Sequence, residues 1–344
     1  MVVTDPKTAK LFEYVDKLPP DCEPFLLETG TETAISTRLA YAFELYSFFG
    51  WLIQMSSTFC DIESPREFSK EDLRRITSQE VSRYISRMMD KGRAERTVAR
   101  KRAALSSFFT YLTDNRILEY NPVAAAVHVK VHQSDEVLHL DVEEQISLLD
   151  SVDSGNKLSD AQFKYHGRYK TRDYALVLLL LDTGMRVSEL HQIDIGDISL
   201  RDRSVLVVRK GGNMQTLFFS DEAYGALNEL IRAYKKKGMT ANNIPLFQTA
   251  KGNRLGIRAI ENLVKKYTVA AIPGKGGKLS PHKMRSSFAM GYYEAEKDIL
   301  ALQRKLGHKS LAATNIYAKA TDKKMQETRS VMEQARNRAR NEDV

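Results

Sequence analysis

The stretch SVLVVRKGGNMQTLFFS, residues 204–220, contains two runs rich in β-branched and apolar residues on either side of a Gly-Gly pair. Two such runs around a glycine turn predict an antiparallel β-hairpin, with Lys210 at its tip. The chain on both sides instead shows apolar residues at helical spacing, over residues 141–151 and 171–181 before the hairpin and to the chain end after it. The second half of the chain is therefore expected to be mainly α-helical with a small antiparallel β-sheet.

The first half of the chain shows helical spacing and is typical of a compact helical domain. Helices are expected over residues 33–54, 69–90 and 96–115, and the Asn-Pro pair at residues 121 and 122 ends the pattern. The polar stretch from His128 to Leu140 fits a linker, and a length of 344 residues favours two domains. The expected divisions are an N-terminal extension before the first helix (1–24), a helical domain (25–125), a linker (126–139), a second domain (140–320) and a C-terminal helix (321–344).

Composition and charge point to a globular protein with a polyanionic partner. Hydrophobic residues make up 42% of the chain and charged residues 28%, as in folded globular proteins. The net charge of +8 and the pI of about 9.2 favour nucleic acid ahead of an anionic membrane surface.

Several classes of protein are disfavoured. The longest apolar run, residues 174–181, is far shorter than the roughly 20 residues that cross a bilayer. The N-terminus lacks the features of a secretion signal. Only Cys22 and Cys60 occur, which predicts neither a disulfide framework nor a zinc site. We expect a cytoplasmic protein that uses no metal or other cofactor and no membrane.

Two fragments of the second domain carry cations and a carboxylate. In TGMRVSEL, residues 183–190, Arg186 stands at the start of a helix and Glu189 follows one turn later on the same face. Lys210 follows Arg186 by 24 residues. Taken alone, Arg186 and Glu189 fit a helix-face ion pair, and Lys210 fits a solvated turn residue. Glu189 can support Arg186 or His282 or be a plain surface acid.

Two later fragments add histidines, an arginine and a tyrosine. SPHKMRSSFA, residues 280–289, carries His282 and Arg285 three positions apart, which places them on one helix face. LGHKS, residues 306–310, carries His308, and Tyr317 follows nine residues later. Singly, the histidines fit helix-end residues and Tyr317 fits a core aromatic. All of these residues in one fixed order are a much more specific pattern.

That order, Arg, Lys, His-x-x-Arg, Gly-His and Tyr, resembles the tyrosine recombinase (phage integrase) family. The resemblance covers roughly residues 138–330 and extends to residues 97–123, which look like the end of the family's helical core-binding domain. It implies a two-domain DNA clamp with catalytic residues at six positions. Two departures are visible: Ser286 stands where the family commonly has a second histidine, and Arg209 stands where glycine is usual. The six catalytic positions are Arg186, Lys210, His282, Arg285, His308 and Tyr317.

The chemistry of strand exchange explains why these residue types belong together. Transesterification of a phosphodiester needs a nucleophile, neutralisation of the non-bridging oxygens and a proton for the leaving oxygen. Tyr317 can supply the nucleophile and conserve the bond energy as a phosphotyrosine, so that resealing needs no ATP. Arg186 and Arg285 can hold the phosphate through planar bidentate contacts, as metal ions do in many nucleases.

The resemblance assigns the proton transfers and the remaining phosphate contact. It gives Lys210 the role of general acid for the 5′ oxygen. It makes His282 a proton acceptor or orienting group near the tyrosine, and His308 a hydrogen-bond donor to the phosphate.

Charged and apolar residues outside this set predict further contacts. Arg96, Arg100, Lys101 and Arg102 fit either a solvated helix face or a phosphate-binding face, and the resemblance favours phosphate contact. In the last helix, Met325, Val331 and Met332 form a sparse apolar stripe. That stripe can pack within its own chain or dock in trans on a neighbouring protomer, and we expect the second.

The main functional expectation is a site-specific DNA recombinase acting as a homo-tetramer on two double-stranded DNA sites. Off DNA, a monomer or weak oligomer is expected, and the chain would associate with the nucleoid when bound. Integration, excision, inversion and dimer resolution share this chemistry, with or without an accessory protein. Two alternatives are a type IB topoisomerase, which relaxes supercoils as a monomer, and a non-catalytic DNA-binding accessory factor. The first domain and the residues beyond Tyr317 favour the recombinase.

Overall fold

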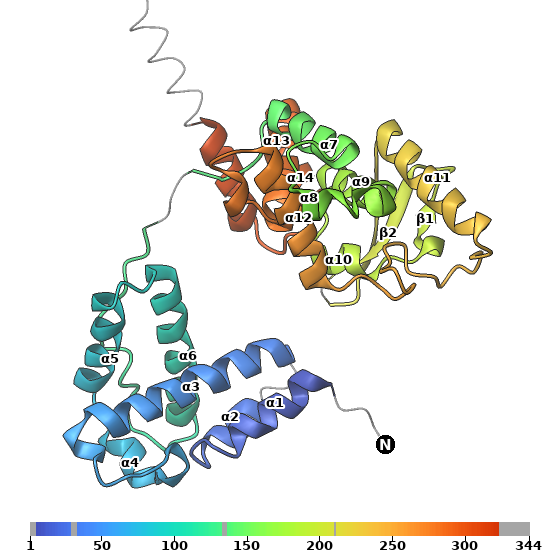
Figure 1. Ribbon diagram of the computed structural model, residues 1–344. Helices are drawn as coiled ribbons and strands as arrows, with labels where there is room; N and C mark the ends of the chain where they lie inside the picture. Colours follow the sequence, from blue (N-terminus) through green and yellow to red (C-terminus); the bar gives the residue numbers. More distant parts are fainter. Residues whose placement is uncertain (1–4, 29–32, 133–135, 210, 323–344) are drawn as a thin grey trace, which may run out of the picture. The chain divides into compact units, whose positions relative to one another are not determined.

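The structure is a computed structural model that describes residues 5–28, 33–132, 136–209 and 211–322 (Figure 1). The chain forms two compact units, Met1–Gln133 and Ser134–Val344. Helices predominate in both, and the sheet seen in the described residues belongs to the second unit. No helix within the described residues is long and apolar enough to cross a membrane.

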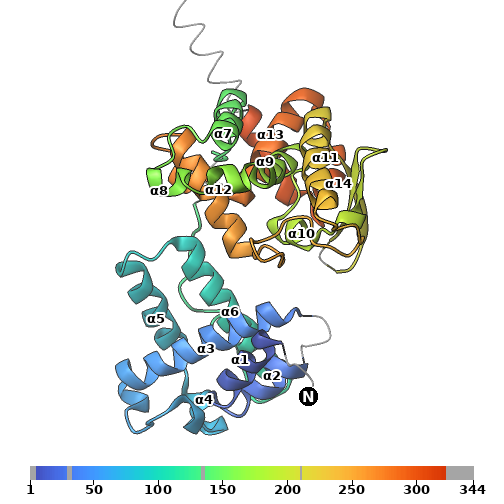
Figure 2. The same cartoon turned by 45° about the vertical axis from the view of Figure 1, so that its right-hand side comes forward.

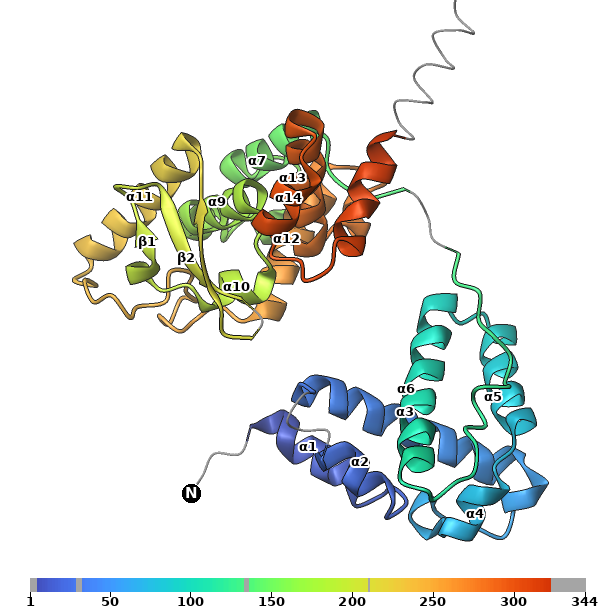
Figure 3. The same ribbon diagram turned by 180° about the vertical axis from the view of Figure 1, so that it is seen from behind.

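The first unit is helical, as expected. The long helix α3 packs against α1, α2, α5 and α6, and Figure 3 shows α1 and α2 alongside it. The expected helices over residues 33–54 and 96–115 are confirmed as α3 and α6. The elements of this unit are α1 (Pro6–Val15), α2 (Cys22–Glu28), α3 (Ile35–Met55), α4 (Lys70–Arg75), α5 (Ser78–Asp90), α6 (Glu95–Asp114) and the short 3-10 turns η2 (Ser57–Phe59) and η3 (Pro65–Glu67).

The prediction that helical structure begins only after residue 24 is wrong. Leu11 and Val15 lie one turn apart on α1, and both are buried in the same core as α3 and α6. Cys22 and Leu26 of α2 are buried there too. These early residues therefore belong to the hydrophobic core of the first unit.

The single helix predicted over residues 69–90 is also wrong, because the chain breaks at Ile76 and Thr77 into α4 and α5. The Thr77 side chain accepts a hydrogen bond from the Glu80 backbone N–H, and the Glu80 carboxylate accepts one from the Thr77 N–H at 3.0 Å. This reciprocal capping box satisfies backbone donors at a new helix start.

The second unit has helices around one small sheet. Strands β1, β2 and β3 form an antiparallel sheet in that order, and Val205 faces Leu217 across the β2–β3 pair, which confirms the predicted hairpin. The elements are α7 (Val142–Ser154), α8 (Asp160–Phe163), α9 (His166–Thr183), α10 (Val187–Gln192), η4 (Ile195–Asp197), β1 (Ile198–Ser199), β2 (Ser204–Val208), β3 (Met214–Phe218), α11 (Asp221–Lys236), α12 (Ile257–Ala271), η5 (Gly276–Lys278), α13 (Pro281–Glu296) and α14 (Ile299–Leu306), followed by a helical stretch over residues 312–322.

Helix α9 is the centre of this unit. Its residues 175–181 are all buried, so this part of the helix is apolar on every side, as a helical segment surrounded by protein must be. It packs against α7, α11 and α13 and contacts β3, and Figure 2 shows these helices grouped around it. The end of α9 is therefore held firmly, and the residues that follow it begin the candidate site.

Candidate active site

Arg285 joins the C-terminal ends of two helices, α9 and α14, each of which is capped by a glycine. Its Nη1 donates to the Gly184 carbonyl at 2.6 Å, just after α9, and its Nη2 donates to the Leu306 carbonyl at the end of α14. Only 2% of Arg285 is exposed. Burial and the charge of Arg186 lower the pKa of Arg285 to about 10, so the side chain stays protonated at neutral pH. A permanent buried cation therefore fixes the TGMR and LGH segments together.

Glycine is required at the first of these loops. Gly184 has φ +58°, and a Cβ added there would lie 2.4 Å from a ring carbon of Phe288. The backbone of α9 can thus turn beside α13 only because residue 184 has no side chain. The turn brings Arg186 to the start of α10.

Arg186 is held by Glu189 through two hydrogen bonds. Its backbone N–H donates to Glu189 Oε2 and its Nη1 donates to Oε1, both at 2.8 Å. Burial favours a higher pKa for Glu189, but these bonds and the charge of Arg209 hold that pKa below its ordinary value. Glu189 is buried whereas 35% of the Arg186 side chain is exposed, so the guanidinium can still receive a ligand. Of the alternatives for Glu189, the structure favours support of Arg186.

His308 follows the glycine that ends α14. Its Nδ1 lies 2.9 Å from the Thr314 hydroxyl, and its backbone N–H donates to the Gln303 carbonyl at 3.1 Å. Burial, together with the charges of Arg285 and Arg186, lowers the pKa of His308 to about 4. The ring is therefore neutral at physiological pH and retains one N–H donor. Sequence reasoning missed Thr314 as its partner.

His282 lies in the first turn of α13 and is exposed. Partial burial of the ring, then the charges of Lys283, Arg285 and Arg186, lower the pKa of His282. The neutral ring can thus accept a proton near the arginines. Ser286, which departs from the family's usual histidine, donates from Oγ to the His282 carbonyl at 3.2 Å.

Tyr317 lies in the helical stretch 312–322 and is only 3% exposed. It packs with Ala289, Met290, Leu302 and Leu306 in a small apolar cluster of α13 and α14, two helices that Figure 3 shows side by side. The carbonyl of Leu306, a member of this cluster, accepts a hydrogen bond from Arg285. Tyr317 is thus a buried aromatic that adjoins the arginine site.

The sixth predicted residue, Lys210, lies outside the described residues. The hairpin around it is closed by backbone bonds, since the Arg209 N–H donates to the Asn213 carbonyl at 2.7 Å and the Gly212 N–H donates to the Arg209 carbonyl at 3.0 Å. The Arg209 side chain reaches Glu189 from this end of the sheet. Sequence reasoning noticed Arg209 only as a departure from glycine. Among the described residues, no three His, Cys, Asp or Glu side chains are grouped so as to hold a metal ion.

The four predicted DNA-contact residues on α6 differ in their surroundings. Arg96 is exposed, whereas Arg100 and Lys101 both bind the buried carboxylate of Glu44 on α3. Arg102 donates to the carbonyls of residues 123 and 127, at 2.9 and 3.2 Å. The Arg102 guanidinium therefore fastens the segment after α6 to that helix, while the other three side chains remain near the surface.

Arg100 and Lys101 also line an open hollow of about 480 Å³ between α3, α5 and α6. Aromatic rings and further cations line the same hollow, and sequence reasoning missed those cations because they lie on a separate helix and loop. The aromatic residues are Phe43, Trp51 and Tyr84, and the additional cations are Arg87, Lys91 and Arg93.

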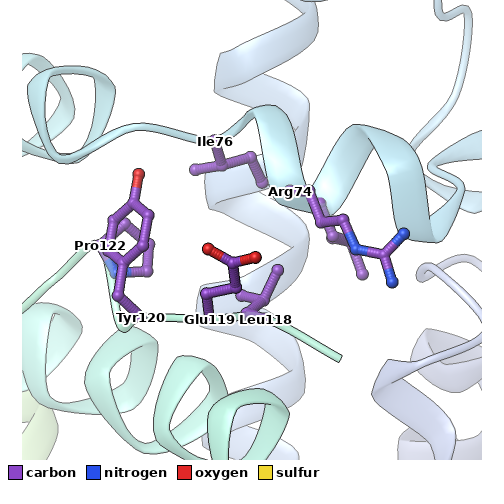
Figure 4. Close-up of a pocket in the computed structure, with 7 residues that line it drawn as sticks. Arg74, Ile76, Leu118, Glu119, Tyr120 and Pro122 are labelled. Carbon is purple, nitrogen blue, oxygen red and sulfur yellow. The ribbon is translucent and has the colours of Figure 1, made fainter. Parts of the chain in front are cut away.

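A smaller hollow of about 260 Å³ lies between α4 and the segment after α6 (Figure 4). Its lining carries one cation, Arg74, and one carboxylate, Glu119. Arg74 also donates from Nε to the Ile117 carbonyl at 3.2 Å. Because its two charges balance, this hollow is a poorer phosphate site than the larger hollow between α3, α5 and α6, which several cations line.

Comparison with known proteins agrees with this arrangement. The profile described as "Phage integrase family" matches residues 150–324, and the one described as "Phage integrase, N-terminal SAM-like domain" matches residues 26–116. Tyrosine recombinase XerC of Caldanaerobacter subterraneus subsp. tengcongensis is 29% identical over 322 residues, covering 90% of this chain and 86% of the relative. Tyrosine recombinase XerC of Pediococcus pentosaceus is 31% identical over 279 residues, covering 78% and 87%.

Solved structures share the fold. A XerH site-specific recombinase bound to palindromic difH substrate superposes with a TM-score of 0.68 at 20% identity, covering 94% of this chain and 89% of that one. A lambda integrase tetramer bound to a Holliday junction gives a TM-score of 0.62 at 17% identity, covering 89% and 76%. The profile matches, the relatives and the order of the site residues agree, and the chain therefore belongs to the phage integrase family of tyrosine recombinases.

Proposed function

We propose that this site-specific tyrosine recombinase cleaves and rejoins DNA strands through a 3′-phosphotyrosine intermediate on Tyr317. The observation that supports this chemistry most directly is the double hydrogen bond of Arg285 to the Gly184 and Leu306 carbonyls. It joins the segment that presents Arg186 to the segment that presents His308. The buried Tyr317 cluster adjoins the same residues. A phosphate near Arg186 would therefore be within reach of several of the required groups.

In the proposed step, the Tyr317 oxygen forms a bond to phosphorus while the bond from phosphorus to the 5′ oxygen breaks. Arg186 and Arg285 balance the charge on the non-bridging oxygens, and the neutral His308 donates a hydrogen bond to one of them. Lys210 would supply the proton that the leaving 5′ oxygen requires. His282, with its lowered pKa, would take up the phenol proton.

Tyr317 must become more accessible before it can attack. At 3% exposure its side chain is covered by α13 and α14, so a DNA phosphate cannot reach it in this conformation. We propose that DNA binding moves the helical stretch 312–322 away from these helices. The buried state would then keep the free protein from cleaving DNA at random.

We propose double-stranded DNA as the partner and a homo-tetramer on two DNA sites as the active assembly. A lambda integrase of the same fold is a tetramer on a Holliday junction, which supports this arrangement. In this scheme, the first unit, including α1 and α2, binds DNA, the second unit performs catalysis and residues 321–344 dock in trans. The DNA substrate would locate the protein in the cytoplasm, with the nucleoid.

The direct test is Tyr317→Phe on a nicked suicide substrate that traps the covalent complex. The variant should bind the DNA site as the unaltered protein does, because only the hydroxyl is lost, and should form no denaturant-resistant adduct. An adduct with the variant would show that the nucleophile is another residue.

A truncation separates the recombinase from the topoisomerase. A chain ending after residue 320 should bind one site but fail to pair two sites in native gels, whereas the full chain should pair them. Recombination by the truncated chain at the normal rate would refute the trans-docking role. Relaxation of supercoils by a full chain that never pairs sites would favour the topoisomerase.

A further inference from the structure

The side chain of Arg209 contacts three separate elements of the second unit. Its Nη1 donates to Glu189 Oε2 on α10 at 2.7 Å, and its Nη2 donates to the Lys305 carbonyl on α14 at 2.8 Å. Its Nε donates to Gln215 Oε1 on β3 at 2.9 Å. Arg209 is only 8% exposed. A guanidinium is the side chain suited to this task, because its N–H groups diverge in a rigid plane.

Two further contacts strengthen the connection to α14. Gln215, which accepts from Arg209, donates from Nε2 to the Arg304 carbonyl at 3.1 Å. The Arg209 guanidinium also packs against Gly307, since a Cβ added there would lie 3.1 Å from Arg209 Nε. The hairpin is thus fixed to the last turn of α14, directly before His308.

The shared carboxylate of Glu189 makes the other connection. One of its oxygens accepts from the Arg186 side chain, and the other accepts from both the Arg186 backbone and Arg209. Arg209 therefore limits where Glu189, and hence Arg186, can lie. A glycine at position 209 has no side chain for any of these bonds.

We propose that Arg209 is a positioning residue that fixes the β2–β3 hairpin to α10 and α14 and so holds Arg186 and His308 at a set separation. This inference rests on the proposed active site. Arg209 is buried and bonded to protein groups, so it acts through Glu189 and the end of α14 and does not touch the phosphate. Its side chain makes contacts that a glycine at position 209 cannot make.

Arg209→Gln tests this role, with Arg203→Gln as the matched control. Arg203 has the same charge and lies in the turn directly before β2, at the opposite end of that strand from Arg209, but its side chain is exposed and pairs with Asp221. Arg209→Gln should bind a single DNA site within about twofold of the unaltered protein and cleave a suicide substrate roughly ten- to a hundredfold more slowly, because small displacements of positioned groups reduce rates by that order. Arg203→Gln should match the unaltered protein in both.

Two further variants separate positioning from a general loss of structure. Arg209→Lys keeps a charge beside Glu189 but cannot make the three-way contact, so it should fold and recover part of the rate. The effects of Arg209→Gln and Glu189→Gln should be non-additive in the double variant, because both act on Arg186 through one carboxylate. Normal cleavage by Arg209→Gln or by Arg209→Lys, or strict additivity, would overturn the role.

Amide hydrogen exchange without DNA keeps this test apart from the proposed chemistry. In Arg209→Gln, the amides of Gly307 and His308 and of residues 211–215 should exchange at least about tenfold faster than in Arg203→Gln, because local opening exposes them. Unchanged exchange would refute the connection even if the unaltered protein cleaves DNA. Faster exchange in a protein that never forms an adduct would support the connection and refute the proposed function.

Discussion

Replacing Gly184 by alanine should be among the most destabilising single-methyl changes in the second unit. The added Cβ would lie 2.4 Å from one Phe288 ring carbon and 2.8 Å from another, so α13 or the ring must move. Overpacking of this kind costs about 1–3 kcal/mol. Holding alanine at φ +58° adds roughly 1 kcal/mol or somewhat more. We therefore expect a loss of about 2–4 kcal/mol in the free energy of unfolding of the second unit, from these two terms together.

Substitutions at two other glycines separate the cost of overpacking from the cost of placing alanine at positive φ. Gly92 has φ +69° with nothing within 4 Å of an added Cβ, so Gly92→Ala reports the backbone cost by itself in the first unit. Gly225 lies inside α11 with open space around it, so Gly225→Ala should stabilise by about 0.5–1 kcal/mol. Phe288→Leu in the Gly184→Ala background should recover part of the loss, because it removes the ring that is struck.

The assay is denaturant unfolding of the full chain, followed by probes for each unit, since two units need not unfold as one. Gly184→Ala should lower the transition of the second unit and leave that of the first unchanged. It should also weaken cleavage, because the Gly184 carbonyl accepts from Arg285. A loss within about 0.5 kcal/mol of that caused by Gly92→Ala, below the usual range for overpacking, would refute the steric reasoning.

Three further predictions concern the chemistry. Lys210→Ala should slow cleavage of an ordinary phosphodiester strongly but cleavage of a 5′-bridging phosphorothiolate much less, because sulfur leaves without a proton; equal losses on both substrates would assign the general acid elsewhere. DNA binding and cleavage should persist in EDTA, while affinity falls on the order of a hundredfold between roughly 50 and 200 mM salt, as several phosphate contacts require; loss of cleavage on chelation would contradict the arginine mechanism. Because the pKa of His308 is lowered to about 4, the unfolded chain takes up that proton first on acidification, so the free energy of unfolding should fall from about pH 6.5 to pH 4. His308→Gln should flatten this dependence in urea titrations at several pH values, and an unchanged slope would count against it.

Local patterns predicted the parts of the fold that depend on neighbours in sequence. The hairpin was predictable because its runs and glycine turn lie within 17 residues, and α6 because its apolar face repeats along most of a 20-residue helix. The break before α5 was missed because the amphipathic pattern continues across Thr77, and only the reciprocal bonds with Glu80 end one helix and begin another. Helices α1 and α2 are short, and burial against α3 stabilises them more than their own sequence does.

In the candidate site, too, the features that sequence patterns predicted differ from those that depend on contacts between distant residues. The residues that resemble the family's reacting groups were named in advance, because their types and order follow from phosphate chemistry. Glu189 was also named, because it lies three positions from Arg186. The other supports were missed, since Arg209 and Lys305 are 96 positions apart and Arg285 and Gly184 are 101 apart. Contacts of that range depend on how helices pack, and no spacing in the sequence reveals them.

The contacts of Arg285 also determine how its charge is compensated before DNA arrives. Both of its carbonyl partners stand at the C-terminal ends of helices, α9 and α14, where the aligned peptide dipoles carry about half a negative charge each. The two helix ends can therefore offset a large part of one buried positive charge, and no carboxylate of the described residues lies at hydrogen-bonding distance from Arg285. A carboxylate in that place would repel the incoming phosphate and would have to be displaced. Peptide dipoles stay where they are, so in the proposed mechanism Arg285, which is 2% exposed here, gives up no partner once DNA binding uncovers it for a phosphate.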